Sequence, residues 1–195
     1  MKSFSPLFDD LQKALQVLPG VGPRSAQRMA LMLLERDRTS ANRLAEALSR
    51  ASRDIQHCQR CFVLSESSEC EICTDPERES ERLLVVENPG QLLAFERAGL
   101  HSGHYFVLNG LISPLDGISP EDARIPQCVE RSQSANEVIL ALSSSVEGEA
   151  TCQYIRAQLP GKTVTRLARG VPMGSDIEQL DPSTLGLAFG ARESF

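Results

Sequence analysis

Apolar positions recur at helical spacing in the N-terminal part of this chain. Ser5 and Pro6 precede "LFDDLQKALQVL", and a serine cap, an early proline and two acids in the first turn predict the start of a helix. After "LPGVGP", an i, i+3, i+4 pattern predicts a second, amphipathic helix with an apolar side made of Ala26, Met29, Ala30, Leu33 and Leu34. The following stretch "TSANRLAEALSRASRDI" predicts a third helix, so this part of the chain is expected to be an all-α module.

Short apolar runs replace the helical pattern after the polar stretch "TDPERESE", residues 74–81. "RLLVVEN" predicts a buried strand, and Asn88 with Pro89 predicts the cap and first position of a helix that ends near Leu100. "YFVLNG", "EVILALS" and "KTVTRLAR" predict three more strands, and "GEATCQYIRAQL" predicts a helix between the last two. This alternation predicts an α/β domain with a mainly parallel sheet flanked by helices.

The hairpin between the first two helices offers a possible phosphate contact. Gly20 and Gly22 can take backbone angles that are closed to other residues, and Pro23 suits the first turn of a helix. A glycine turn that opens a helix leaves backbone N–H groups exposed, which favours a phosphate oxygen. Arg24 and Arg28, one turn apart, would lie beside it. The alternative is a simple turn between two helices with two surface arginines.

Four of the six cysteines have the spacing of a metal site, Cys-x2-Cys-x8-Cys-x2-Cys. They are Cys58, Cys61, Cys70 and Cys73. Each two-residue spacer lets a tight turn aim two sulfurs at one point, and four thiolates complete the tetrahedral shell of Zn²⁺. A redox centre of the thioredoxin type would show one such pair beside a βαβ unit. The spacing therefore predicts a small zinc knuckle with one structural zinc per chain and no open position for a substrate.

Three other residues with metal-ligating side chains are not expected to bind this metal. His57 is adjacent to the first ligand, but four thiolates already fill the shell, so an exposed side chain is expected. Cys128 and Cys152 are isolated in the sequence and are expected to be small core residues.

Acidic residues follow two of the predicted strands. Glu87 comes after the first strand, and Glu147 and Glu149 come after the third. Ligands of parallel sheets gather at the carboxyl ends of the strands, and three carboxylates converging there could hold Mg²⁺. Acidic loops on an acidic protein explain the same residues equally well.

Charge is divided unevenly along the 195 residues, which have the composition of a soluble globular protein. The net charge of −6 argues against a protein coated in nucleic acid. Residues 1–60 nevertheless carry ten Lys or Arg against six Asp or Glu, whereas residues 61–195 carry ten against twenty. A basic module on an acidic body is typical of localised phosphate contact. No run approaches the ~20 apolar residues of a membrane span, and no signal peptide is evident, so a cytoplasmic protein without membrane contact is expected.

Several motifs in this order resemble the RecR family of bacterial recombination and repair proteins. They are "LPGVGPRSAQRMA", the four-cysteine knuckle, "VVENPGQLLAFERAG", "LISPLDGISPEDARI", "VEGEAT" and "RGVPMGSDIEQLD". The resemblance implies a helix-hairpin-helix DNA-binding module in residues 1–53 and a C4 zinc finger in 54–77. It also implies a Toprim domain in residues 81–176 and a C-terminal oligomerisation tail in 177–195.

The same resemblance implies a function. Members of the family are not enzymes; they form ring-shaped tetramers and act with RecO and RecF, helping RecA to load on gapped single-stranded DNA. Residues of this chain that match the DNA-facing hairpin are Gly20, Gly22, Arg24 and Arg28. Residues that match the acidic Toprim positions, which are associated with partner docking, are Glu87, Glu147 and Glu149.

Two other functions remain open at this point. One is a magnesium-dependent Toprim nuclease or topoisomerase, although catalytic Toprim enzymes carry Asp-x-Asp where this chain has Glu147-x-Glu149. A topoisomerase also needs a nucleophilic tyrosine, and both Tyr105 and Tyr154 are expected to be packing residues. The other is a zinc-stabilised scaffold that binds only proteins. The partner DNA could be single-stranded, gapped or duplex.

Overall fold

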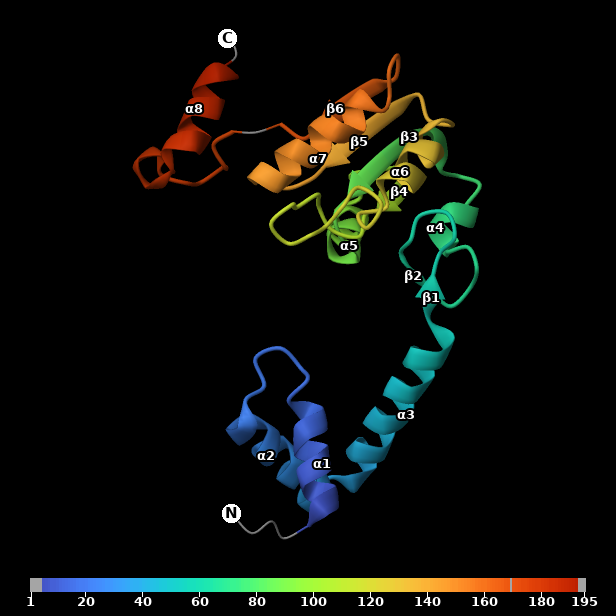
Figure 1. Cartoon of the computed structure of the whole chain (residues 1–195), viewed down its shortest axis with the longest axis vertical. Coiled ribbons are helices and arrows are strands. Elements are labelled where there is room, and N and C mark those ends of the chain that lie inside the picture. The colour runs from blue at the N-terminus through green and yellow to red at the C-terminus, as the bar shows by residue number, and fades with distance from the viewer. Residues whose placement is uncertain (1–4, 169, 193–195) are drawn as a thin grey trace. The chain divides into compact units, whose positions relative to one another are not determined.

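The computed structural model describes residues 5–168 and 170–192, and these fall into two compact units, Met1–Ile55 and Gln56–Phe195. The first unit is all-α, as expected. Its helices are α1 (Pro6–Leu15), α2 (Pro23–Leu31), one π-helical turn η1 (Met32–Arg36) and α3 (Arg38–Asp54). Figure 1 shows α1 and α2 side by side, joined by the hairpin loop.

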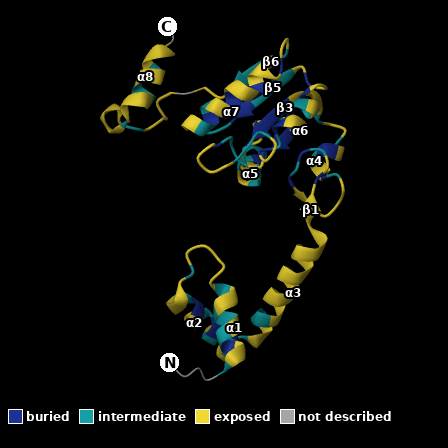
Figure 2. Cartoon of the chain, viewed as in Figure 1, coloured by how far each residue is buried: buried dark blue, intermediate teal, exposed yellow. Residues whose placement is uncertain are grey.

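The core of this first unit is small. Its buried apolar residues are Phe8, Ala26, Ala30 and Leu33. The amphipathic pattern is confirmed, with Met29 and Leu34 half-buried beside them. In contrast, α3 has no buried residue and is exposed along most of its length (Figure 2). The unit therefore presents most of its polar surface, including its arginines, to solvent.

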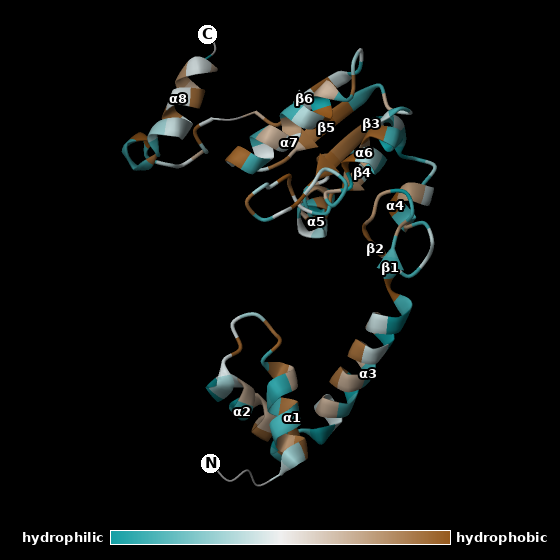
Figure 3. Ribbon diagram, viewed as in Figure 1, coloured by the Kyte–Doolittle hydropathy of each residue, from teal (hydrophilic) through white to brown (hydrophobic). Residues whose placement is uncertain are grey.

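The second unit contains a four-stranded, wholly parallel sheet with strand order β4-β3-β5-β6. The strands are β3 (Glu79–Val86), β4 (Gly103–Val107), β5 (Glu137–Ala141) and β6 (Thr163–Arg166). Each was expected from its apolar run, and Figure 3 shows hydrophobic colouring along the central strands β3 and β5. The predicted end of the last strand at residue 169 lies outside the described residues. The α/β fold class with a parallel sheet is confirmed.

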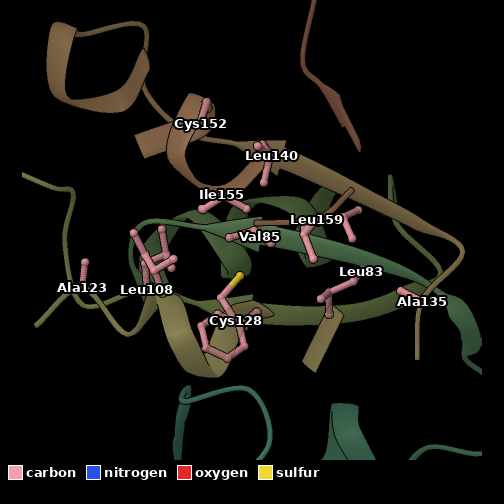
Figure 4. Close-up of a cluster of buried hydrophobic side chains, with 13 residues drawn as sticks. Leu83, Val85, Leu108, Ala123, Cys128, Ala135, Leu140, Cys152, Ile155 and Leu159 are labelled. Atoms are coloured by element: carbon pink, nitrogen blue, oxygen red, sulfur yellow. The ribbon is translucent and has the colours of Figure 1, made fainter. Parts of the chain in front are cut away.

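Helices cover both faces of the sheet because successive residues of β3 point in opposite directions. Leu83 and Val85 belong to one core cluster, together with residues of α6 (Ile125–Ser132) and α7 (Val146–Ala157). Figure 4 shows this cluster, in which Cys128 and Cys152 are buried as expected. Leu84 and Val86 belong to the other cluster, which α5 (Pro89–Ala98) covers through Leu92.

The four-cysteine knuckle completes that second face. It consists of β1 (Gln56–His57), β2 (Leu64–Ser65) and the short helix α4 (Glu71–Thr74). All four cysteines belong to the same cluster as Leu84, Val86 and Tyr105. The knuckle and the sheet therefore share one hydrophobic core.

Some elements differ from the expectation. The sequence did not predict α6, the 3₁₀ turn η2 (Ile177–Gln179) or α8 (Pro182–Gly190). The helix after Asn88 ends two residues earlier than Leu100, because Gly99 takes a left-handed conformation at its C-terminus. None of the described helices combines the length and the apolar character that a membrane span needs.

Candidate metal centre and nucleic-acid interface

The knuckle brings the four predicted ligands together. The Sγ atoms of Cys58, Cys61, Cys70 and Cys73 all lie within 4.8 Å of one another, and all four residues are buried. A tetrahedral zinc with Zn–S distances of about 2.3 Å needs sulfurs about 3.8 Å apart, so the cluster fits this ion. The backbone N–H of Cys70 also donates to the sulfur of Cys58 at 3.3 Å. All six cysteines are free thiols, which agrees with a metal site rather than a disulfide framework.

The thiols interact strongly with one another. Hydrogen bonding from Cys61 lowers the pKa of Cys73 to about 6. The same bond and burial raise the pKa of Cys61. Without a metal ion, the thiolate form of Cys73 is thus favoured at the expense of that of Cys61. A bound Zn²⁺ favours the thiolate form of all four cysteines.

The side chain of His57 lies outside this cluster. The residue is exposed, and its Nδ1 lies 2.9 Å from the carbonyl oxygen of Phe62. This confirms the expectation that it is not a ligand.

The hairpin after α1 has the expected turn, but only one of its two glycines adopts backbone angles that disfavour other residues. Gly20 has φ +78°, in the left-handed region that disfavours residues with a Cβ. Gly22 is the N-cap of α2 with φ −83° and ψ 174°, an extended conformation open to any residue. The expectation was therefore wrong for Gly22, whose glycine is not required by the backbone. An added Cβ at either position would meet no atom within 4 Å.

Arg24 and Arg28 lie in the first two turns of α2, and both side chains are exposed. Ion pairs among the described residues of this unit join Lys13 to Asp10 and Arg53 to Asp54. Arg24 and Arg28 have no carboxylate partner in the described part of the chain. Their charges are therefore available to an external anion.

The three glutamates at the sheet edge have separate surroundings. The carboxylate of Glu87 accepts a hydrogen bond from the backbone N–H of Ser143, which ties the end of β3 to the segment after β5. Glu147 and Glu149 lie in the first turn of α7, which begins at Val146, two residues before the predicted start of this helix at Gly148.

Glu149 is also engaged within the second unit. Its carboxylate forms an ion pair with Arg166 at 3.0 Å and accepts a hydrogen bond from Gln153 at 3.0 Å. Within residues 5–168 and 170–192, the group of side chains close enough to hold a metal ion is the four cysteines. The expected convergence of the three carboxylates is not present, and magnesium at this edge stays a prediction.

Of the two tyrosines, only one is a packing residue. Tyr105 is buried, and its hydroxyl donates to the carboxylate of Glu96 at 2.6 Å. Burial and this bond raise its pKa, so it is a poor nucleophile. Tyr154 is 39% exposed, and the expectation that it packs in the interior was wrong.

Sequence reasoning missed the arginines around the knuckle. Arg60 lies between two of the ligands and donates to the carbonyl oxygen of Cys73 at 2.9 Å. Its position inside the Cys-x2-Cys pair was a usable local signal. Arg131 comes from α6 and lines a cavity of about 350 Å³ together with Arg60 and Phe62. Nothing local in the sequence connects Arg131 with the cysteines.

Comparison with known families gives four matches. Residues 8–52 match a family described as RecR, helix-hairpin-helix, and residues 55–75 match the RecR zinc finger domain of the four-cysteine type. Residues 81–168 match the Toprim domain, and residues 170–193 match RecR, C-terminal. The zinc-finger match and the clustered sulfurs together establish one structural zinc per chain.

Proposed function

The chain belongs to the RecR family, and from this membership we propose that it is a non-enzymatic, DNA-binding recombination mediator. Its family domains support a role in DNA repair and recombination. In the proposal it acts with RecO and RecF and helps RecA to load on gapped single-stranded DNA. The site of action is the cytoplasm.

The observation that carries the proposal is the state of Arg24 and Arg28. Both are exposed on α2 directly after the glycine turn, and neither has an ion-pair partner among the described residues. The four N-terminal N–H groups of a helix lack intrahelical acceptors, and anions are favoured there. Two guanidinium groups without ion-pair partners at the N-terminus of α2 are suited to contact with the phosphate backbone of DNA more than to the recognition of bases.

The other parts of the molecule have proposed roles as well. Residues 1–53 contact DNA, the zinc finger of 54–77 and the Toprim domain of 81–176 form the body, and 177–195 supports assembly into a ring tetramer. The acidic residues Glu87, Glu147 and Glu149 belong to the surface that docks a protein partner. The four-thiolate zinc has no open coordination position, which agrees with a structural and not a catalytic metal.

Fluorescence anisotropy on a gapped DNA tests the proposal, with RecO added and at salt concentrations of about 50 and 200 mM. The wild type is compared with Arg24→Ala/Arg28→Ala. Each phosphate that a variant no longer neutralises on duplex DNA reduces the salt slope by about 0.9, so the double variant should bind more weakly and with a shallower slope.

The matched control is Arg97→Ala/Arg156→Ala, which removes two exposed arginines from the other unit and changes the net charge equally. It should bind DNA as the wild type does. If the two double variants bind alike, the hairpin is not the DNA-facing surface and the proposal is wrong. Nicking of supercoiled plasmid that depends on Mg²⁺ and persists in highly purified protein would instead support the Toprim enzyme.

A further inference from the structure

A cavity of about 350 Å³ lies between the zinc finger and α6. Its volume is within the range of pockets that hold small ligands. The polar side chains of its lining come from two segments that are far apart in the sequence, and most of them are hydrogen-bond donors. The lining residues that matter here are Gln59, Arg60, Phe62, Gln127, Glu130 and Arg131.

Arg131 contributes a half-buried cation that lacks a carboxylate partner among the described residues. Its Nε is buried and has no hydrogen-bond acceptor there either. Glu130 lines the same cavity but does not neutralise Arg131, because adjacent residues of a helix do not face each other. The arginines of the second unit that do form ion pairs are Arg60, Arg78, Arg82 and Arg166.

Two further arginines lie at this cavity. Arg60 is in its lining and forms an ion pair with Glu69 at 3.2 Å. The guanidinium carbon of Arg124 lies 4.6 Å from the centroid of the Phe62 ring, which is also part of the lining. That ring packs edge-to-face against Phe106, with 5.3 Å between the two centroids, so this wall of the cavity is held in place.

This concentration of positive charge is unusual for the acidic part of the chain. Residues 61–195 carry ten Lys or Arg against twenty Asp or Glu. The charges of Arg131 and Arg60 also act together on the buried His104, whose pKa they lower in addition to the effect of burial. A half-buried cation without a partner is costly, and an anion bound in the cavity would remove that cost.

We propose that the cavity between the zinc finger and α6 binds a phosphate group, with Arg131 as its main charge partner and Arg60 as the second. The planar guanidinium of arginine matches the oxygens of a phosphate, and the amides of Gln59 and Gln127 supply further donors. The phosphate can belong to a nucleic-acid backbone or to a free nucleotide. This site is separate from the hairpin of the first unit, so it does not rest on the function proposed above.

The test uses the full chain and three probes. Inorganic phosphate and thymidine monophosphate are titrated by calorimetry, and a labelled single strand of about ten thymidines is followed by fluorescence anisotropy. The wild type is compared with Arg131→Gln, Arg131→Lys and Glu130→Gln. The matched control is Arg97→Gln, which removes an exposed arginine of α5 from the same unit. Circular dichroism identifies which variants are folded.

Arg131→Gln should bind the probes about 10-fold more weakly, which is the size of one lost hydrogen bond between charged groups. Arg131→Lys should keep part of the affinity, because it retains the charge but not the planar fork. Glu130→Gln should bind more tightly, since it removes a carboxylate from the lining, and Arg97→Gln should behave as the wild type does. A loss confined to phosphate and the mononucleotide identifies a free nucleotide as the ligand, whereas a loss for the oligonucleotide identifies DNA.

The proposal is overturned if the wild type binds none of the probes, or if Arg131→Gln and Glu130→Gln bind all three as the wild type does. Glu130 is exposed, so its variant keeps the test decisive even if Arg131→Gln does not fold. Arg24→Ala/Arg28→Ala should bind thymidine monophosphate normally. If this hairpin variant loses the mononucleotide while Arg131→Gln keeps it, the phosphate binds at the hairpin; the cavity site is then wrong and the proposed function stands.

Discussion

The backbone N–H of Val107 donates a 2.8 Å hydrogen bond to the carbonyl oxygen of Cys61. Val107 is the last residue of β4, the edge strand of the sheet, and Cys61 is a zinc ligand. The knuckle therefore contacts the edge strand at its C-terminal end and covers part of one face of the sheet.

Loss of zinc should consequently damage more than the knuckle. Cys70→Ser removes one ligand, and structural zinc sites supply about 10–16 kcal/mol to the folding of small metal-binding segments. We expect the zinc content to fall well below one per chain, the melting temperature of the protein to drop, and the proposed ring to dissociate. Elemental analysis, calorimetry and size-exclusion chromatography measure the three effects.

His57→Ala is the matched control for Cys70→Ser, because His57 is adjacent to a ligand but exposed. It should keep its zinc and its melting temperature. A zinc-loaded, fully stable Cys70→Ser protein would mean that three thiolates suffice and that the fourth is dispensable.

The two glycines of the hairpin should respond differently to alanine. Gly20→Ala forces a left-handed conformation on a residue with a Cβ, at a cost of about 1–2 kcal/mol. Gly22→Ala should leave the stability unchanged, because the backbone at Gly22 is extended and an added Cβ meets no atom within 4 Å. Thermal denaturation distinguishes the two variants.

DNA binding provides a second measurement on Gly22→Ala. If a phosphate approaches the start of α2 closely, the methyl group should weaken binding in a protein of normal stability. Unchanged binding would indicate that the DNA backbone stays away from this residue.

The features that the sequence predicted correctly are local ones. The cysteine spacing fixes the ligand set within one short segment, and Asn88 caps α5 by accepting a hydrogen bond from the N–H of Gln91. The continuous apolar run of β3 likewise predicts a buried strand without knowledge of its neighbours. These elements are determined by residues a few positions apart, so their residue pattern is sufficient to predict them.

The features that the sequence did not predict depend on distant contacts. Helix α6 begins after Arg124, which has φ +60° and is not a usual helix cap, and its apolar side becomes recognisable only against the sheet. The carboxylate of Glu87 accepts a hydrogen bond from Ser143, and Arg131 lines a cavity together with Arg60 and Phe62, because the fold brings separate segments together. No spacing rule connects such pairs.

Stability should fall at acidic pH partly through Glu96. Burial raises its pKa, but hydrogen bonds from Arg78 and Tyr105 outweigh burial, so its pKa lies below the usual value. A carboxyl group with a lowered pKa stabilises the fold above its unfolded pKa of about 4.3, and this contribution is lost as the pH falls through its folded value. We expect Glu96→Gln to be less stable at pH 7 and to lose less stability between about pH 5 and pH 3.

Urea denaturation across this pH range measures the effect, with Glu130→Gln as the control because Glu130 is exposed. Parallel pH curves for the wild type and Glu96→Gln would show that Glu96 has no part in the acid response.

The glycine between the two α7 glutamates should be essential for the geometry of the sheet edge. A Cβ on Gly148 would lie 2.1 Å from the carbonyl oxygen of Ser143, and real Cβ atoms essentially never come that close to another atom. Gly148→Ala must therefore displace Ser143, whose N–H is bonded to Glu87. Overpacking of this kind costs about 1–3 kcal/mol.

If the three glutamates form part of the partner-docking surface, Gly148→Ala should also weaken binding to RecO, measured by calorimetric titration at a temperature where the variant is folded. Gly170→Ala is the control, since nothing lies within 4 Å of its added methyl group and the residue lies outside the proposed assembly tail, and it should bind RecO normally. The displaced Ser143 alters this edge of the sheet directly. Normal RecO affinity in a destabilised Gly148→Ala protein would therefore mean that the acidic turn is not part of the partner-docking surface. Weaker RecO binding in Gly148→Ala alone would connect the position of Ser143 with the docking surface.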